Sequence, residues 1–165
     1  MPRIDVPADT DPLVFLWTER ARPLTSTAGA FSDAVYRRSS LPLREFEAAR
    51  TRIAQINDCT ICKGWRTARD VPGWSDDPEA VPEEFYDHVG RDWDGFSERE
   101  RLAAEFAERF ALDHPAMDDD LWIRLHGAYA DDELADLTMC CGMFLGLGRV
   151  LAVIGVRAPD ERILV

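Results

Sequence analysis

Residues 43–62 read LREFEAARTRIAQINDCTIC, and this stretch carries the two patterns that decide the fold. The first is an apolar repeat at intervals of three and four residues, formed by Phe46, Ala49, Ile53 and Ile56. That spacing places the four side chains on one face, so it predicts a helix that opens at Leu41-Pro42. The second is Asn57-Asp58, a pair that ends this helix, and either residue could cap a new helix that is expected from about Cys59 to Arg69.

Helical patterns also occur on both sides of this stretch. Ser97 and Glu100 have the spacing of a capping box in front of an amphipathic segment. Asp131-Asp132 precedes a long, nearly all-apolar helix. No segment alternates apolar and polar residues for long enough to require a sheet, so the sequence predicts an all-α fold. The further helices are expected over residues 28–40, 83–89, 97–110, 121–129 and 131–154.

The organisation of the chain indicates one domain with an irregular N-terminal arm. The first 25 residues contain four prolines, so we expect an irregular N-terminal arm over residues 1–25 that lies on the body. The chain has 165 residues, close to the usual size of one domain, and contains no evident linker or repeat. A single domain over residues 1–165 is expected.

Charge and hydropathy exclude several classes of partner. The net charge of -12 would repel nucleic-acid phosphates and anionic membranes, so neither is an expected partner. No secretory signal is evident, and the apolar run Leu137–Leu147 reaches only about half a membrane span. A cytoplasmic, reducing setting is expected. There, four cysteines indicate redox or metal chemistry, or core packing, before structural disulfides.

Cys59 and Cys62 form a CxxC motif at the expected start of a helix. Residues three apart lie about 60° apart around a helix axis, and a helix N-terminus favours a thiolate. One thiol could then attack while its neighbour resolves the intermediate. Arg66 would lie on the same face and lower a thiol pKa. Core packing and half a metal site are the alternatives, although Cys140-Cys141, adjacent in an apolar segment, is a poor second ligand pair and is expected in the core.

The neighbourhood of this motif resembles the carboxymuconolactone decarboxylase family in its AhpD-like, alkylhydroperoxidase branch. Glu47 stands twelve residues before Cys59, Arg52 follows Glu47 by five, and Ala54 and Asn57 are in step with the family pattern. Downstream, the resemblance continues through residues 96–100, 121–122 and 132–138, and it spans roughly residues 28–156. It implies an AhpD-like helical bundle of about six to eight helices, assembled as a dimer, trimer or hexamer. Gly142 and Gly146, four residues apart, would allow close helix approach.

The resemblance also implies a chemistry. Family members with CxxC are thiol-dependent peroxidases or disulfide reductants that need no bound cofactor beyond the cysteine pair. By position, Cys62 would attack, Cys59 would resolve, and Glu47 would take part in a proton relay. Helix-end electrostatics alone favour Cys59 as the thiol of lower pKa, so both assignments remain open.

The chain departs from the family pattern at two positions. Arg66 stands where a histidine is expected four residues after the second cysteine, and Ile61 stands where a histidine sometimes lies inside the motif. An arginine holds a thiolate but does not shuttle protons, so the family relay cannot operate unchanged. Glu47 could pair with Arg66 beside the thiols. A helical projection instead places Glu47 opposite the apolar stripe, on a solvated face or in a local pair with Arg50.

The three histidines offer no evident replacement for the relay. His88 and His114 fall in acidic, loop-like contexts and are expected at the surface, whereas His126 is interpreted as a core residue. The leading hypothesis is therefore a dithiol oxidoreductase that reduces a small hydroperoxide or the disulfide of a redox partner. Its alternative is a non-catalytic binding or assembly domain that has lost the relay. Lactone decarboxylation is disfavoured, because that branch typically lacks the cysteine pair.

Overall fold

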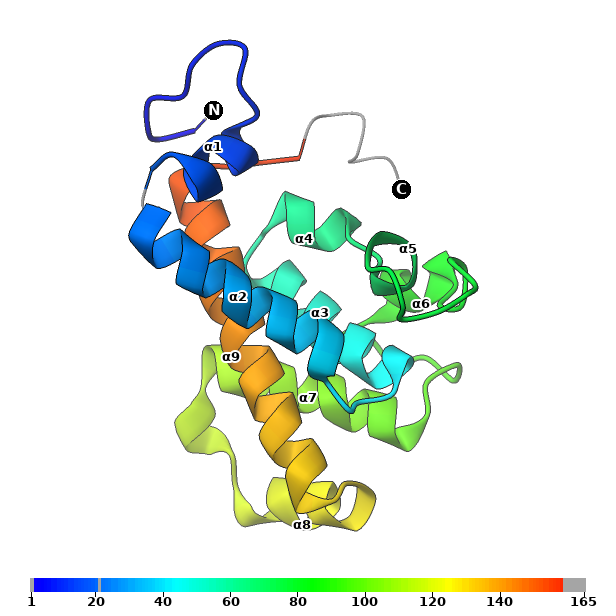
Figure 1. Cartoon of the computed structure of the whole chain (residues 1–165). Coiled ribbons are helices and arrows are strands. Elements are labelled where there is room, and N and C mark those ends of the chain that lie inside the picture. Colours follow the sequence, from blue (N-terminus) through cyan, green and yellow to red (C-terminus); the bar gives the residue numbers. More distant parts are fainter. Residues whose placement is uncertain (1, 21, 159–165) are drawn as a thin grey trace.

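A computed structural model describes residues 2–20 and 22–158, and all regular structure in that part of the chain is helical (Figure 1). It consists of α1 (Pro12–Thr18), α2 (Arg22–Arg38), α3 (Leu43–Ile56), α4 (Thr60–Gly64), α5 (Thr67–Asp70), α6 (Glu83–His88), α7 (Glu98–Leu112), the 3-10 helix η1 (His114–Ala116), α8 (Asp119–Ala128) and α9 (Asp131–Ile154). The all-α prediction is confirmed. The described segments hold nine α-helices rather than six to eight, because α4, α5 and α6 are short pieces.

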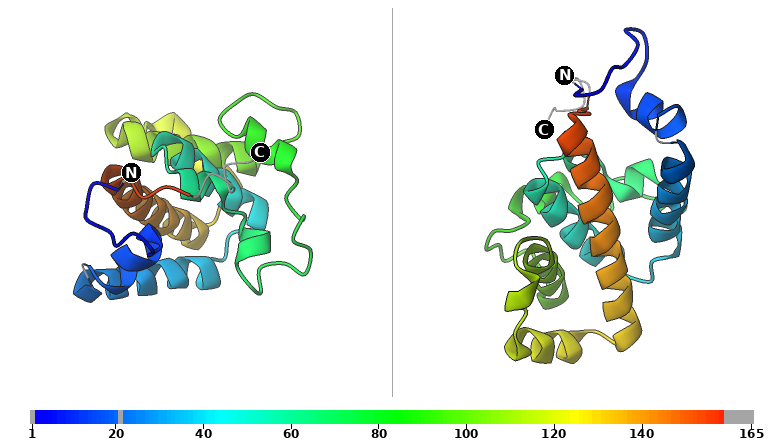
Figure 2. Two further views of the ribbon diagram at one scale, coloured as in Figure 1. Left: turned by 90° about the horizontal axis from the view of Figure 1, so that it is seen from above. Right: turned by 90° about the vertical axis from the view of Figure 1, so that its left-hand side faces the viewer.

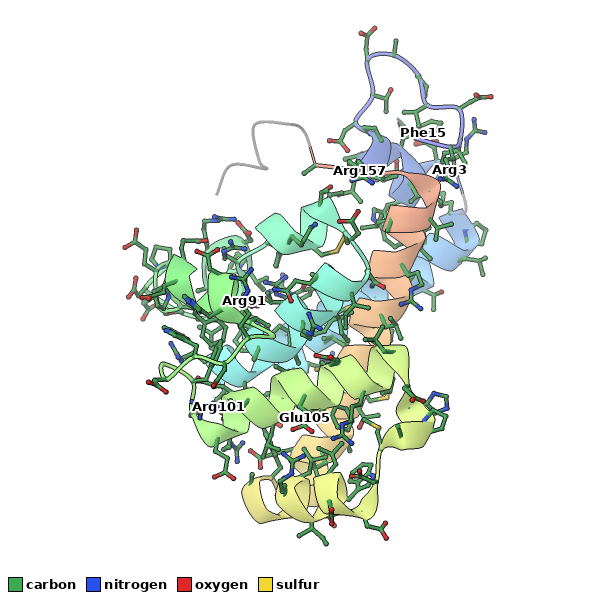
Figure 3. The ribbon with its side chains drawn as sticks, turned by 180° about the vertical axis from the view of Figure 1, so that it is seen from behind. Arg3, Phe15, Arg91, Arg101, Glu105 and Arg157 are labelled. Carbon is green, nitrogen blue, oxygen red and sulfur yellow. A yellow bond between two sulfur atoms is a disulfide. The ribbon has the colours of Figure 1, made fainter. Side chains whose placement is uncertain are left out.

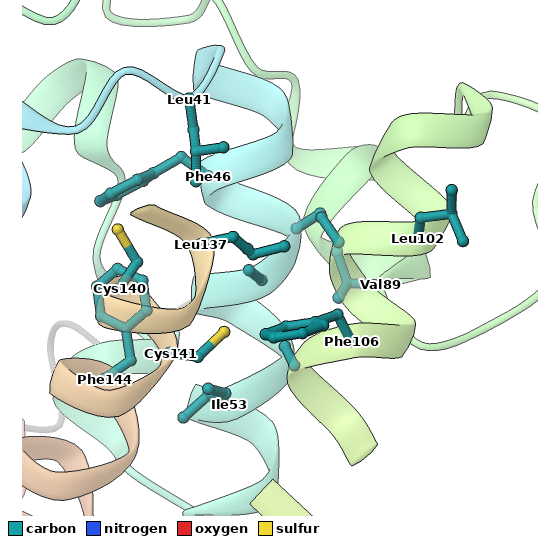
Figure 4. Packing of buried hydrophobic residues seen from close by; sticks show 14 of the residues in the cluster. Leu41, Phe46, Ile53, Val89, Leu102, Phe106, Leu137, Cys140, Cys141 and Phe144 are labelled. Atoms are coloured by element: carbon teal, nitrogen blue, oxygen red, sulfur yellow. The ribbon is translucent and has the colours of Figure 1, made fainter. Parts of the chain in front are cut away.

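Helix α3 lies at the centre of the bundle, between α7 and α9. Phe46, Ala49 and Ile53 of the predicted stripe are fully buried. Figure 4 shows side chains from α3, α7 and α9 meeting in one cluster, with Phe106 from α7 and Leu137 from α9 both completely buried. At about 25 cal/mol per Å² of apolar surface, this shared core is the main source of stability.

The helix ends follow local capping chemistry. The Ser97 hydroxyl accepts from the Glu100 amide at 3.2 Å, while the Glu100 carboxylate accepts from the Ser97 amide at 3.0 Å, which confirms the predicted capping box. Helix α9 begins at Asp131 and ends at Ile154, as predicted, and Gly155 closes it with a positive φ of 76°. Such a conformation costs glycine little, so the chain can turn there.

The N-terminal arm is more regular than expected. Residues 12–18 form α1, and α2 begins at Arg22 rather than Ala28. Pro12 sits in the first turn of α1, where its missing N–H has no cost, and the Asp11 carboxylate accepts from two amides of that turn. Leu16 then packs against Leu151 at the end of α9, so the arm does lie on the body (Figure 2).

The helix predicted from Cys59 to Arg69 is interrupted. Trp65 and Arg66 both have extended backbones, with ψ of 139° and 108°, and they separate α4 from α5. A continuous helix, with 100° of rotation per residue, would place Arg66 on the same face as the cysteines, but the helix is not continuous here. This break is the structural reason that several sequence-based expectations about Arg66 are wrong.

Helix α9 is long and apolar enough, by length and composition, to cross a membrane, and it is the one such helix among the described residues. Its inner face packs on α3 and contains Cys140 and Cys141, both free and buried as predicted. Gly142 and Gly146 lie on its exposed face, where an added Cβ would meet no other atom within 4 Å. No helix of the described chain crosses α9 at these glycines.

Ion pairs lie on the outer surface of the bundle. Glu105, on the outer face of α7 (Figure 3), pairs with Arg109 and Arg124 at 2.8 Å each. These side chains are about one-third to one-half exposed, so each pair contributes little to stability, of the order of 0–1 kcal/mol.

Candidate thiol site and cavity

Cys59 and Cys62 are joined by a disulfide bond at the start of α4. Cys59 is the N-cap residue and is fully buried, and its Sγ accepts a hydrogen bond from the Cys62 amide at 3.2 Å. Cys62 is partly exposed. The two sulfurs therefore differ in access, with only that of Cys62 bordering open space.

The turn before the motif fixes its position against α9. The Asn57 amide group donates to the carbonyl oxygens of Phe144 and Leu145 at 3.2 and 3.1 Å. Asp58 has a positive φ of 50°, a conformation that Asp tolerates better than most residues. The Asn57-Asp58 pair thus ends α3 as predicted, and Asn57 attaches residues 57–62, the thiol loop, to α9. The prediction that one of these two residues caps the next helix is wrong, because the N-cap of α4 is Cys59.

A cavity of about 470 Å³ opens beside Cys62 between α1, α2, α4 and α9. Gly148 of α9 forms part of its wall, and a Cβ placed there would lie 3.5 Å from Cys62 Sγ and 2.9 Å from Asn57 Nδ2. A larger residue at Gly148 would crowd the thiol. The rest of the wall is mainly apolar and includes Leu13, Trp17, Ile61, Phe144, Leu147 and Leu151.

Glu47 and Arg50 form a fully buried ion pair on the side of α3 that faces α4. Arg50 Nε lies 2.6 Å from Glu47 Oε1, and Arg50 Nη2 lies 3.0 Å from Glu47 Oε2. The same guanidinium donates to the carbonyl oxygens of Cys62 at 2.6 Å and Trp65 at 2.8 Å. Arg50 thereby attaches both the second cysteine and the end of α4 to α3.

The charge of Glu47 is strongly stabilised at this place. Burial by itself would raise the pKa of Glu47, but the charge and hydrogen bonds of Arg50 lower it below its ordinary value. The Thr67 hydroxyl, which donates to Glu47 at 2.5 Å, lowers the pKa further. Glu47 is therefore an ionised hydrogen-bond acceptor whose oxygens are already engaged.

The predicted positions of Glu47 and Arg66 need correction. Glu47 is not on a solvated face, because α4 and α5 cover that side of α3, and its partner is Arg50 rather than Arg66. The local pair with Arg50 is confirmed. Arg66 instead pairs with Glu83 at 2.6 Å and lies over the Tyr86 ring at 3.9 Å. It does not line the cavity.

The histidines lie away from the thiols. His88 stacks on Trp93 and is exposed, and His114 is exposed, as predicted. His126 is wrongly assigned to the core: its side chain is 55% exposed, because Leu121 and Leu125 define the buried face of α8. None of the three lines the cavity, and the described residues contain no cluster of three or more His, Cys, Asp or Glu side chains suited to a metal ion.

Comparisons with known proteins agree with this architecture at the level of fold. No protein-family profile and no curated protein matches the sequence. An alkylhydroperoxidase AhpD core structure, an uncharacterized peroxidase-related protein from Ralstonia eutropha, is similar with a TM-score of 0.67 and 19% identity over 87% of this chain and 75% of its own. The chain has the AhpD-like fold.

Two further solved structures share that fold over nearly the whole chain. One is a protein of unknown function from Agrobacterium tumefaciens with a suggested AhpD role in antioxidant defence, at a TM-score of 0.75 and 18% identity, covering 98% of this chain and 100% of its own. The other is an uncharacterized peroxidase-related protein from Silicibacter, at a TM-score of 0.71 and 16% identity, covering 98% and 94%. At such identities the AhpD-like likeness concerns the backbone, not the chemistry.

Sequence reasoning missed part of this site. Arg50 was predicted as a local partner of Glu47, three residues away on the same helical face, but its hydrogen bonds to the Cys62 and Trp65 carbonyl oxygens were not. No sequence pattern indicated Tyr36 of α2 or Gly148 of α9 as a site residue. Their place in the wall of the cavity that Cys62 also lines follows only from how α2 and α9 pack around α4.

Proposed function

We propose that the protein is a dithiol oxidoreductase in which Cys62 and Cys59 cycle between dithiol and disulfide. The substrate would be a hydroperoxide or the disulfide of a redox partner. The observation that carries the proposal is the access of Cys62 to an apolar cavity while its bonded partner, Cys59, is buried behind it. A thiol that meets substrate and a protected resolving thiol are the two parts such a cycle requires.

The proposed peroxide reaction has two steps. The Cys62 thiolate attacks one peroxide oxygen, the O–O bond breaks, and an alkoxide leaves and takes up a proton, so that Cys62 becomes a sulfenic acid. The Cys59 thiolate then attacks the Cys62 sulfur, the disulfide forms as the S–O bond breaks, and the departing hydroxide takes a proton from solvent to become water. An external dithiol supplies two electrons to restore the reduced pair, and no bound cofactor is required.

Exposure favours Cys62 as the attacking thiol, and the hydrogen bond from the Cys62 amide suits Cys59 to a buried, capping role. Arg50 binds the Cys62 carbonyl and places a permanent cation near the motif, where it would favour the thiolate. Glu47 would hold Arg50 in place rather than carry protons. Arg66 would have a structural role, since its guanidinium is engaged by Glu83 and Tyr86.

Peroxide oxidation of the reduced protein tests this proposal. Wild-type protein should lose two thiols for each equivalent of hydroperoxide, while Cys59→Ser should stop at a sulfenic acid on Cys62 and Cys62→Ser should not react. Cys141→Ser is the matched control, because that thiol is buried in the core. Native Cys59 and Cys62 thiols that resist peroxide and partner disulfides alike would refute the proposal.

The second candidate is a non-catalytic binding or assembly domain. Two observations favour it: Arg66 replaces the expected histidine and is turned away, and the outer face of α9 exposes Met139 and Val153 by 57% and 61%. Self-association as a dimer, trimer or hexamer would cover such a face, and sedimentation velocity measures it. Cysteine-dependent hydroperoxide turnover by purified protein, abolished in Cys62→Ser, would reject the non-catalytic reading.

A further inference from the structure

Tyr36 of α2 reaches the same cavity as Cys62 from a different element. Its ring packs against Phe46, Trp65 and Phe144, with ring centroids 5.6 to 5.9 Å apart. Its carbonyl oxygen accepts a hydrogen bond from the indole of Trp74. Both the ring and the backbone of Tyr36 are therefore held in place at the cavity wall.

The hydroxyl of Tyr36 is left available. No described residue forms a hydrogen bond with it. In the described part of the chain, two buried side-chain polar atoms have no hydrogen-bond partner, Trp65 Nε1 and the Tyr86 hydroxyl. The Tyr36 hydroxyl also has no partner but is not among these buried atoms, so it keeps some accessible surface. Tyr36 itself lines the cavity. An unpartnered phenol at a cavity wall is a free hydrogen-bond donor.

The surroundings keep this phenol protonated. Burial raises the pKa of Tyr36 above its ordinary value, and the negative charge of Glu47 adds to the increase, although Arg50 opposes it. Asp70 from α5 and Cys140 from α9 act in the same direction as Glu47. The hydroxyl thus carries its proton at every pH at which the protein would work.

The charged groups Arg50, Asp33 and Asp70 at the cavity are less suited to donate a proton. Arg50 has its guanidinium engaged by Glu47 and by two carbonyl oxygens. Asp33 and Asp70 also line the cavity, but they pair with Arg37 at 2.6 Å and Arg69 at 2.8 Å. A carboxylate paired with arginine only accepts hydrogen bonds.

We infer that Tyr36 is a catalytic residue of the proposed peroxide reaction, its hydroxyl donating the proton that the leaving alkoxide requires. The inference rests on the proposed function. When the Cys62 thiolate takes one peroxide oxygen, the O–O bond breaks and the alkoxide removes the Tyr36 proton to leave as an alcohol. Water then returns a proton to the phenolate. Tyr36 would supply the proton for which the AhpD-like pattern has a histidine, a residue absent from this cavity.

The test uses two peroxides whose leaving groups differ in their need for a proton. tert-Butyl hydroperoxide releases a strongly basic alkoxide, whereas peracetic acid releases acetate, which leaves without protonation. Oxidation of the reduced protein is followed in a single turnover by loss of the Cys62 thiol. Positioned acids typically contribute 10²–10⁴-fold, so Tyr36→Phe should slow the reaction with tert-butyl hydroperoxide by about 100-fold and that with peracetic acid by less than about twofold.

Tyr129→Phe is the matched control, because the Tyr129 hydroxyl donates to the Arg99 carbonyl at 2.6 Å and Tyr129 does not line the cavity. It should leave both rates unchanged. Equal slowing with both peroxides, or no slowing with either, would overturn the role of Tyr36 while leaving the thiol cycle intact. Wild-type protein whose Cys62 reacts with neither peroxide would overturn the peroxide reaction of the proposed function, and the role of Tyr36 with it.

Discussion

Helix α3 has two buried sides that are built from opposite chemistry. The side facing α7 and α9 is apolar, with Phe46 and Ile53 packed into a shared core. The side facing α4 holds a fully buried ion pair, Glu47 with Arg50, whose remaining donors fix the thiol loop. Removing atoms from an apolar core lowers the free energy of unfolding in proportion to what is removed, whereas removing one partner of a buried ion pair leaves an uncompensated charge and costs about 3–5 kcal/mol. The comparison indicates that the core supports the fold and the ion pair positions the cysteines.

The largest effect is expected from breaking the ion pair. Arg50→Met leaves the Glu47 carboxylate buried without its cation, and this should lower the free energy of unfolding by about 3–5 kcal/mol. Denaturant titration measures the change. The double variant Glu47→Leu with Arg50→Met removes both charges and should recover most of the loss. A double variant as unstable as the single one would contradict the electrostatic explanation.

The polar side should also respond to acid. Because the folded-state pKa of Glu47 lies below the ordinary value of 4.5, the unfolded chain takes up a proton at a higher pH than the folded protein does. Glu47 therefore contributes stability above about pH 4.5 and loses it as the pH falls through its lowered folded-state value. Several surface carboxylates also have lowered pKa values, so the contribution of Glu47 is measured as the difference between the wild type and the double variant. The wild-type free energy of unfolding should fall more steeply below pH 4.5 than that of the double variant; identical slopes would contradict the assignment.

The apolar side should tolerate a small deletion. Ile53→Val removes one methylene from a fully buried position and is expected to cost about 0.5–1.5 kcal/mol. Thermal unfolding measures this change, and the rate of thiol oxidation should remain that of the wild type. A large loss of thiol reactivity in this variant would mean that the two sides of α3 are coupled.

The smallest effect on the thiol chemistry is expected at Arg66. Its buried guanidinium pairs with Glu83 and also donates to the carbonyl oxygens of Lys63 and Trp65 at 2.7 and 3.0 Å, so Arg66→Gln should lower the free energy of unfolding by about 1–3 kcal/mol. Since Arg66 does not line the cavity, the rate of peroxide oxidation should nevertheless stay unchanged. A marked fall in that rate would show that Arg66 takes part in the thiol chemistry.

Much of the fold followed from local patterns. The stripe of α3, the Ser97–Glu100 capping box and both ends of α9 are set by residues close in sequence, and all are confirmed. The break at Trp65-Arg66 was missed. Gly64, at the end of α4, was a weak local signal for it, but a single glycine does not by itself end a helix. Because this break was not predicted, Arg66 was wrongly placed on the same helical face as the cysteines.

The sequence by itself determined the helical class and the place of the cysteine pair at a helix start, because periodicity and capping act over a few residues. The AhpD-like arrangement followed from the resemblance of residues 28–156 to that family. Tertiary structure decided which sulfur meets open space, which arginine serves the thiol loop, and which side chains from α2 and α9 share the cavity. Access and charge at a site depend on segments far apart in sequence, and spacing along one helix carries no information about them.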